Sequence, residues 1–286
     1  MGSFQARVMK MSAFRYPSVF ISHGSPMLAF GEDAFSSMLE KFAASLPKPK
    51  AVVFISAHSV SSETVHILKT DQNTIMHDFN GFPDELYEMN YQCPGEPAVA
   101  DQVSQLLLKD GFQAKIDTES ALDHGIWIPM KHLYPNGDVP VVRVSLPLNL
   151  TPAKILKLGH ALAPLREEGV MIIASGGAVH NLRELRWSHK TLEGAAWATE
   201  FEEWLVSMLS KKDVDSIVNA EEHPHFYQAH PSQEHFLPII ATIGAALPGD
   251  QLQILNRGVE YFSLSMLCFA LSAYVNPKNV ESRSLH

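Results

Sequence analysis

The chain has 286 residues, of which 46% are hydrophobic and 19% charged, and its formal net charge is −9. This composition is typical of a soluble globular protein with a large core. The acidic balance, with no basic stripe and no apolar stretch long enough to span a bilayer, argues against a nucleic-acid or membrane partner. The two cysteines, Cys93 and Cys268, provide no disulfide framework, which favours a reducing, cytoplasmic setting.

Short apolar runs alternate along the chain with segments whose apolar residues have helical spacing. The almost wholly apolar runs predict buried strands at 18–22, 51–57, 64–69, 139–146, 170–177 and 262–271. The helical patterns are at 33–46, which Asp33 caps, and at 97–111, 151–169, 194–212 and roughly 233–247. With no internal repeat or linker, this alternation predicts one three-layer α/β/α domain over residues 1–286, with 1–16 as a flexible N-terminal extension.

A histidine follows each of three predicted buried strands. His23 follows the run 18–22, His58 follows the run that ends at residue 57, and His180 follows "VMIIASGGAV". Ligand sites in open α/β sheets lie beyond the carboxyl ends of the strands. One histidine in such a place usually caps a strand or packs in the core, but three at one sheet edge predict a site. Neutral imidazole is a ligand for Zn, Fe, Cu or Ni.

Two further histidines have patterns that leave more than one interpretation open. In "HPSQEHFLPIIATIG", Glu234 and His235 open a helical pattern. Adjacent helical residues point about 100° apart, so the two are not expected to face the same metal, and the alternative is a helix-dipole carboxylate beside a surface histidine. His124, in "ALDHGIWIPMKHLYP", either belongs to a ligand pocket or is a loop histidine held by Asp123.

Several ordered motifs extend this pattern over nearly the whole chain. They are "HGSPM", "SAH", "HDFNGFPDELYEMNYQCPG", "LDHGIW", "ASGGAVHNLR", "QEHFLP" and "FSLSM". Together they resemble the DOPA-dioxygenase type of the class III (LigB-like) extradiol aromatic ring-opening dioxygenases, in its bacterial branch. The resemblance implies a single α/β domain with a mixed central sheet, which holds one non-haem divalent metal at its strand ends.

The resemblance also implies a metal-ligand set. His23, His58 and His235 match the metal ligands of this branch. Other class III enzymes have two histidines and a glutamate, so Glu234 remains an alternative to His235 as the third ligand. Three neutral ligands would leave a divalent metal its full +2 charge, whereas a carboxylate would reduce the charge of the site to +1 and weaken its attraction for a catecholate.

The implied activity is extradiol cleavage of a catechol such as L-DOPA with O2. His180 matches the acid–base histidine, which in some family structures is also a fourth metal ligand, and an imidazole suits both proton transfers near neutral pH. His124 matches a second active-site histidine that contacts the substrate or the bound oxygen. Three facial ligands leave open positions on Fe(II), the metal expected for O2 chemistry. Zn(II), which has no redox chemistry, is a plausible bound metal.

The sequence indicates the substrate-binding residues less clearly, and it also leaves other functions open. One loop either covers the mouth of the site or packs as an ordinary surface loop, and its side chains are His77, Asp78, Phe79, Phe82 and Tyr91. Arg183 or Arg186 either binds a substrate carboxylate or forms a solvated salt bridge. Two other functions stay open, a zinc hydrolase with Glu234 activating water and a non-catalytic metal- or partner-binding protein. The presence of all five histidines argues against the non-catalytic function.

Overall fold

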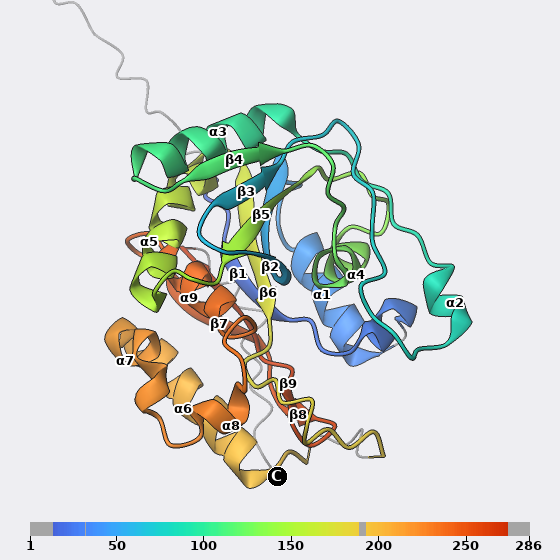
Figure 1. Ribbon diagram of the computed structural model, residues 1–286, viewed down its shortest axis with the longest axis vertical. Helices are drawn as coiled ribbons and strands as arrows, with labels where there is room; N and C mark the ends of the chain where they lie inside the picture. Colours follow the sequence, from blue (N-terminus) through green and yellow to red (C-terminus); the bar gives the residue numbers. More distant parts are fainter. Residues whose placement is uncertain (1–13, 32, 189–192, 274–286) are drawn as a thin grey trace, which may run out of the picture.

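The computed structural model describes residues 14–31, 33–188 and 193–273 (Figure 1). In this part of the chain, eight strands form the main sheet, in the order β4 (Ala114–Asp117), β3 (Val65–Leu68), β5 (Val141–Pro147), β2 (Ala51–Ser61), β6 (Val170–Gly176), β1 (Ser18–Ser22), β10 (Cys268–Ser272) and β7 (Gln251–Asn256). A separate two-stranded sheet joins β8 (Val259–Glu260) to β9 (Leu264–Ser265).

The main sheet is mixed, as expected. Strands β5, β2, β6 and β1 at its centre are all parallel to one another, whereas β10 pairs antiparallel with both β1 and β7. The parallel strands are apolar on both faces because helices cover both faces. Their carboxyl ends share one edge of the sheet, and this edge is where the predicted site residues follow the strands.

Helices pack on both sides of the sheet and give it three layers (Figure 1). Along β2, Val53 and Ile55 belong to one core, whereas Val52 and Phe54 belong to the other. The first core includes α3 (Pro97–Lys109), α5 (Pro152–Leu162), α6 (Ala196–Lys211) and α9 (Leu237–Gly244). The second includes α1 (Ala34–Ala44), which Asp33 caps as predicted, and α4 (His124–Leu133). Alternate side chains of a strand point to opposite faces, so this division confirms the α/β/α prediction.

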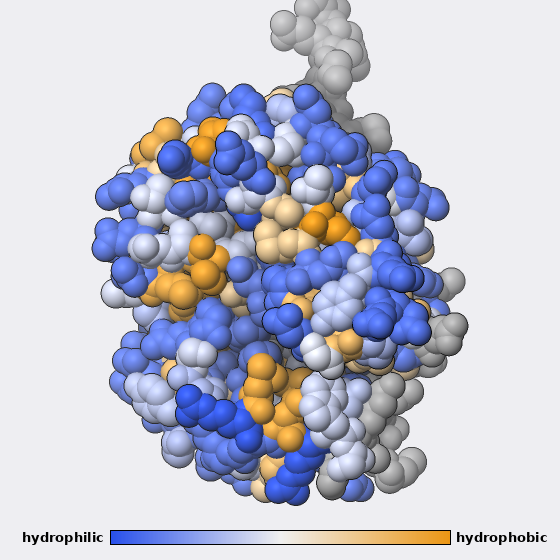
Figure 2. Space-filling view, turned by 45° about the vertical axis from the view of Figure 1, so that its right-hand side comes forward, coloured by the Kyte–Doolittle hydropathy of each residue, from blue (hydrophilic) through white to orange (hydrophobic). Residues whose placement is uncertain are grey.

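Shorter elements complete the fold. They are the helices α2 (Asp84–Tyr87), α7 (Val214–Val218) and α8 (Phe226–Ala229) and the 3-10 turns η1 (Pro26–Phe30), η2 (Ala163–Glu167) and η3 (Ala220–Glu222). In the described part of the chain, no helix has the length and hydropathy needed to cross a membrane. The surface in Figure 2 is mostly hydrophilic, with separate apolar patches.

Several element boundaries differ from the prediction, each for a local reason. The predicted helix 151–169 ends at Leu162 and continues only as a 3-10 turn, because Pro164 has no N–H to donate to the preceding turn. The predicted helix 233–247 begins only at Leu237, next to Pro238, so Glu234 and His235 lie in the turn before it.

The strand predictions also need correction. Strand β2 continues to Ser61, so His58 lies within the strand, where the register with β5 shifts between Ile55 and Val60. The predicted strand 262–271 is two strands, β9 and β10, which belong to different sheets. The first thirteen residues of the predicted extension 1–16 lie outside the described residues, whereas Tyr16 is buried and its N–H donates to the carbonyl of Arg166.

Candidate metal centre

Three histidine side chains from distant parts of the chain converge beyond the sheet edge. His23 directly follows β1, His58 lies in β2, and His235 lies in the turn before α9. Nε2 of His58 lies 3.1 Å from Nε2 of His23 and 3.3 Å from Nε2 of His235. Nitrogens that share a metal at about 2.0–2.1 Å would be about 2.8–3.4 Å apart for octahedral to tetrahedral angles. The three Nε2 atoms therefore have the spacing of a metal-binding set.

Hydrogen bonds on the far side of two of these rings fix their tautomers. Nδ1 of His23 lies 3.3 Å from Oγ of Ser175, whose own hydroxyl donates to the carbonyl of Gly125 at 2.6 Å. Ser175 therefore accepts from Nδ1–H of His23. Nδ1 of His235 donates to Oε1 of Glu234 at 3.1 Å. With their protons on Nδ1, both rings present an unprotonated Nε2 to the centre, as metal-binding histidines do.

The three imidazoles are also neutral. Burial, together with repulsion from the other histidines, lowers the pKa of His23 and of His235 well below the usual range. Burial and the nearby His124 lower the pKa of His58 to about 3, although Asp78 raises it. Unprotonated nitrogens that face one another at 3.1–3.3 Å repel unless a cation lies between them. This donor set fits a divalent transition metal, which takes neutral imidazole nitrogen.

Asp78 orients His124 and lies beside His58. Its Oδ1 accepts from the main-chain N–H of His124 at 2.9 Å and from Nδ1 of the same residue at 3.0 Å. Its Oδ2 lies 3.7 Å from Nδ1 of His58. Burial alone would raise the pKa of Asp78, but the hydrogen bonds from His124 outweigh burial and lower it. Asp78 is therefore a carboxylate that holds the ring of His124 at the first turn of α4.

The alternative in which Asp123 holds His124 does not match the structure. Asp123 is buried and accepts from the hydroxyls of Ser56, at 2.6 Å, and Ser59. These two serines flank His58 in β2, so Asp123 fixes the irregular end of this strand. Sequence adjacency suggested the wrong carboxylate because Asp78 is 46 residues from His124 along the chain.

His180 lies beside the three-histidine cluster rather than within it. Its ring stacks on that of His235, with centroids 3.5 Å apart and an interplanar angle of 4°. Among the described residues, the groups with donor atoms close enough to share a metal are His23 with His58 and His235, and His58 with Asp78 and His124. Burial lowers the pKa of His180 to about 4, against the opposing effect of Glu234.

Two close approaches require glycine next to the cluster. A Cβ on Gly125 would lie 2.6 Å from Oγ of Ser56 and 3.1 Å from Nδ1 of His23. A Cβ on Gly176 would lie 2.2 Å from the carbonyl oxygen of His235. Glycine therefore lets α4 and the turn before α9 approach the strand ends closely. "LDHGIW" and "ASGG" contain this signal, but the sequence does not show which segments approach.

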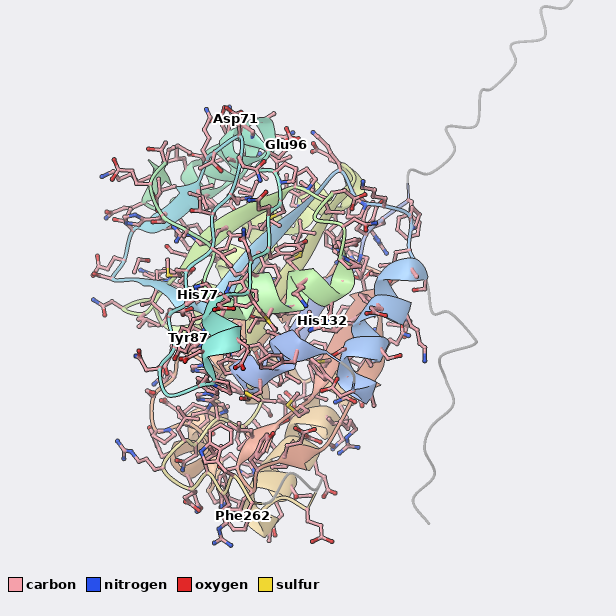
Figure 3. The ribbon with its side chains drawn as sticks, turned by 90° about the vertical axis from the view of Figure 1, so that its right-hand side faces the viewer. Asp71, His77, Tyr87, Glu96, His132 and Phe262 are labelled. Carbon is pink, nitrogen blue, oxygen red and sulfur yellow. The ribbon has the colours of Figure 1, made fainter. Side chains whose placement is uncertain are left out.

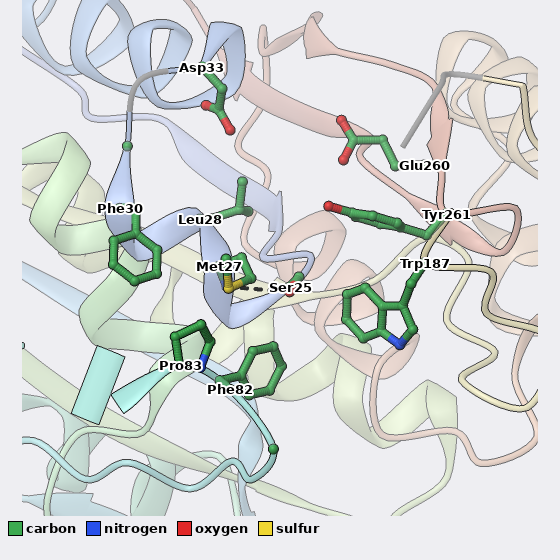
Figure 4. A pocket seen from close by; sticks show the side chains of 12 residues that line it. Ser25, Met27, Leu28, Phe30, Asp33, Phe82, Pro83, Trp187, Glu260 and Tyr261 are labelled. Carbon is green, nitrogen blue, oxygen red and sulfur yellow. Dashed lines mark hydrogen bonds between the residues drawn. The ribbon is translucent and has the colours of Figure 1, made fainter. Parts of the chain in front are cut away.

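The loop after Asp78 is partly core and partly surface. His77 lies beside Tyr87, as Figure 3 shows, and its Nε2 donates to the carbonyl of Met89. Phe79 and Tyr91 are buried, as the packed-loop interpretation expects. Three other residues were named as possible substrate contacts. Phe82 lines a cavity (Figure 4) and Arg183 is exposed to solvent. The guanidinium of Arg186 lies over the ring of Phe262.

A mixed α/β sheet with a buried histidine cluster at its strand ends defines a metal-dependent enzyme, and comparison with known proteins gives its family. Residues 17–268 match the family described as the catalytic LigB subunit of aromatic ring-opening dioxygenase. The chain belongs to this family, and it is an extradiol aromatic ring-opening dioxygenase that acts on a catecholic substrate with O2.

Curated relatives and a solved structure agree with this assignment. The chain is 35% identical over 261 residues to 4,5-DOPA dioxygenase extradiol of Escherichia coli K12, and the aligned region covers 90% of this chain and 95% of that protein. It is 36% identical over 245 residues to the protein of the same name from Beta vulgaris, covering 83% and 90%. The crystal structure of an uncharacterized Escherichia coli K12 protein has a TM-score of 0.79 and 30% identity, covering 90% of this chain and 100% of that one.

Proposed function

We propose that this enzyme opens the ring of a catechol such as L-DOPA with one Fe(II) per chain, held by His23, His58 and His235. The observation that carries the ligand assignment is the position of Nε2 of His58, 3.1 Å from Nε2 of His23 and 3.3 Å from Nε2 of His235, with one ligand atom of each residue within 4.8 Å of the others. The names of the relatives, 4,5-DOPA dioxygenase extradiol, support the substrate. Iron, when bound, supplies the redox chemistry that zinc lacks.

His180 is the proposed acid–base residue. It is neutral at pH 7 because burial lowers its pKa to about 4, so one ring nitrogen is available to accept the proton of a catechol hydroxyl. The same ring returns the proton when the ring-opened product forms. A base positioned in this way contributes about 10²–10⁴-fold to the rate. Its stack on His235 keeps it next to the ligand set.

His124 is the proposed contact for the substrate or the oxygen-derived atoms. Asp78 accepts both its main-chain N–H and its Nδ1–H, so only Nε2 remains for a ligand. Glu234 is proposed as the residue that orients His235 and not as a ligand, because its carboxylate bonds Nδ1 on the outer side of that ring. This placement also disfavours a zinc hydrolase that uses Glu234 to activate water.

Anaerobic loading with Fe(II), followed by L-DOPA and O2, tests the proposed function. We expect one O2 consumed per catechol, a yellow ring-opened product, and neither of these with the zinc-loaded enzyme. His180→Gln should lower kcat by about 10²–10⁴-fold with its iron retained. Oxygen uptake that persists unchanged in His58→Ala would contradict the proposal, and zinc-dependent hydrolysis without oxygen uptake would support the hydrolase instead.

The cysteines support a proposed compartment. Cys93 and Cys268 are both buried and unbonded to each other. We propose a reducing, cytoplasmic setting, because free buried thiols persist there without oxidation.

A further inference from the structure

Two of the segments that carry site histidines are hydrogen-bonded to each other. One follows β6 and carries His180, and the other follows α8 and carries His235. The N–H of Gly177 donates to the carbonyl of His235 at 3.0 Å. The N–H of His180 donates to the carbonyl of Ala229 at 2.9 Å. The rings of His180 and His235 stack between these bonds, with centroids 3.5 Å apart, so the position of His180 depends on how the two segments are joined.

The side chain of His230 joins the same two segments. This residue directly follows α8 and is 1% exposed, and its Nε2 donates to the carbonyl of Ala178 at 3.0 Å. Burial lowers the pKa of His230 to about 3, so the ring is neutral at pH 7. Because a carbonyl only accepts, the one ring proton lies on Nε2. The bond therefore fixes the main chain two residues before His180.

The surroundings of His230 are those of an apolar side chain. The centroid of its ring lies 5.1 Å from that of Phe236, and 5.5 Å from those of Phe201 and Phe226. Its Nδ1 is buried and has no hydrogen-bond partner among the described residues. An unpaired buried nitrogen lowers stability, and an apolar side chain would fill the same space without this cost. Packing therefore does not explain a histidine at this position, whereas the bond to Ala178 does.

Strand β9 also holds the segment that carries His180. The N–H of Ser265 donates to the carbonyl of Val179 at 3.0 Å, and Leu264 forms an antiparallel bridge with His180. These are main-chain bonds, which persist when a side chain is changed. Substitution of His230 therefore removes one specific link and leaves the bonds to β9 in place.

We propose that His230 is a positioning residue for ring cleavage, and that its bond to Ala178 sets the place at which the ring of His180 stacks on His235. His230 contacts neither substrate nor metal, because Ala178 occupies its Nε2 and its Nδ1 is buried. The inference rests on the proposed acid–base role of His180 and adds a residue that acts through it. A displacement of about 1 Å can cost about 100-fold in rate, so the bond needs to prevent only a small movement.

Two substitutions at His230 separate the bond from the volume of the side chain. His230→Leu fills the aromatic surroundings without a donor, so kcat of the Fe(II)-loaded enzyme for L-DOPA should fall by about 10–100-fold. His230→Gln carries an amide Nε2 that can reach the carbonyl of Ala178, so kcat should lie within about 3-fold of the wild type. Both should keep one iron per chain. His230→Asn, whose shorter amide does not reach Ala178, takes the place of the leucine variant if that variant does not fold.

A double-mutant cycle tests whether His230 acts through His180. Adding His230→Leu to His180→Gln should lower kcat by less than about 2-fold further, because no acid–base ring is left to position. A general structural effect would instead multiply the two losses. His132→Leu is the matched control, since His132 is also buried and its Nε2 donates to the carbonyl of Leu28 at 2.7 Å, in the core on the other face of the sheet. It should lower the urea midpoint similarly and keep kcat within about 2-fold.

Crystal structures of the zinc-loaded variants give a second measurement that does not depend on activity. We expect the ring of His180 to leave its stack on His235 in His230→Leu and to keep it in His230→Gln. An unchanged stack in His230→Leu, equal kcat losses in the two variants, or a further 10-fold loss in the double mutant would overturn this inference and leave ring cleavage standing. Failure of the wild-type iron enzyme to open any catechol would overturn the proposed function, whereas the crystal structures would still test the link between His230 and His180.

Discussion

Glu234 accepts a hydrogen bond from Nδ1 of His235 at 3.1 Å, on the opposite side of the ring from the Nε2 that faces His58. The carboxylate therefore fixes the tautomer and orientation of the proposed ligand without entering the cluster. Carboxylate–histidine pairs of this kind raise the basicity of the ligand and hold its ring in place.

This pair makes the first prediction. Glu234→Gln should weaken Fe(II) binding by about 10–100-fold, because the amide is a poorer acceptor than the carboxylate. Anaerobic metal titration of the variant beside Glu221→Gln, whose side chain is exposed, measures the effect. A complete loss of binding, equal to that in His235→Gln, would identify Glu234 as a ligand and contradict the assignment.

The second prediction concerns Asp78. Asp78→Asn removes the charge that holds Nδ1 of His124, so kcat should fall by about 10–100-fold while the iron content stays near one per chain. Steady-state rates and iron analysis of the same preparation separate the two effects. Asp84→Asn, at an exposed position at the start of α2, is the control. Loss of iron in Asp78→Asn would show instead that Asp78 acts mainly through His58, 3.7 Å away.

A buried ion pair predicts a large effect on stability. The side chain of Arg166 is fully buried and pairs with Asp250 at 2.6 Å, and it also donates to the carbonyls of Tyr16, Ala245 and Leu271. Arg166→Met leaves Asp250 buried beside fewer donors, so the free energy of unfolding should fall by about 3–5 kcal/mol. Urea unfolding measures this loss, with the exposed Arg183→Met expected to change it by less than about 0.5 kcal/mol. A loss below about 1 kcal/mol would show that the pair contributes little.

The lowered pKa of Asp117 leads to a prediction of how the free energy of unfolding depends on pH. Burial raises its pKa, but hydrogen bonds from Ser120 and Glu119 and the charge of Arg143 outweigh burial and lower it to about 2. Because the folded-state pKa lies below the unfolded value, the stabilisation is complete above pH 4 and is lost as the pH falls from about 4 to about 2. Asp117→Asn should therefore cost at most about 2 kcal/mol at pH 7. The difference in stability between the variant and the wild type should shrink below pH 4, and a difference that stays constant with pH would contradict this account.

The central strands and three of the site histidines were predictable because their signals are local. Buried parallel strands are apolar runs, and their carboxyl ends share one edge of a sheet, so His23, His58 and His180 had to lie near one another. The edge strands β4 and β7 gave no comparable signal. They are short and only partly buried, so their sequences do not differ clearly from those of loops.

The residues that orient the histidines depend on contacts between distant segments. Asp78 reaches His124 across 46 residues, and Ser175 reaches His23 across 152. The spacing of apolar residues along the chain gives no information about hydrogen bonds between segments so far apart. The role of Glu234 was ambiguous for a different reason, because the helical pattern extended over the turn before α9, which begins only at Leu237.

The assignment of the metal ligands is tested most directly by anaerobic Fe(II) titration of the wild type and four single variants. The account predicts one iron per chain in the wild type and in His180→Gln, whose ring stacks beside the cluster. It predicts binding at least about 100-fold weaker in His23→Gln, His58→Gln and His235→Gln, because each loses one of three ligands. Equal loss of iron in His180→Gln, or full retention in any of the other three, would contradict it.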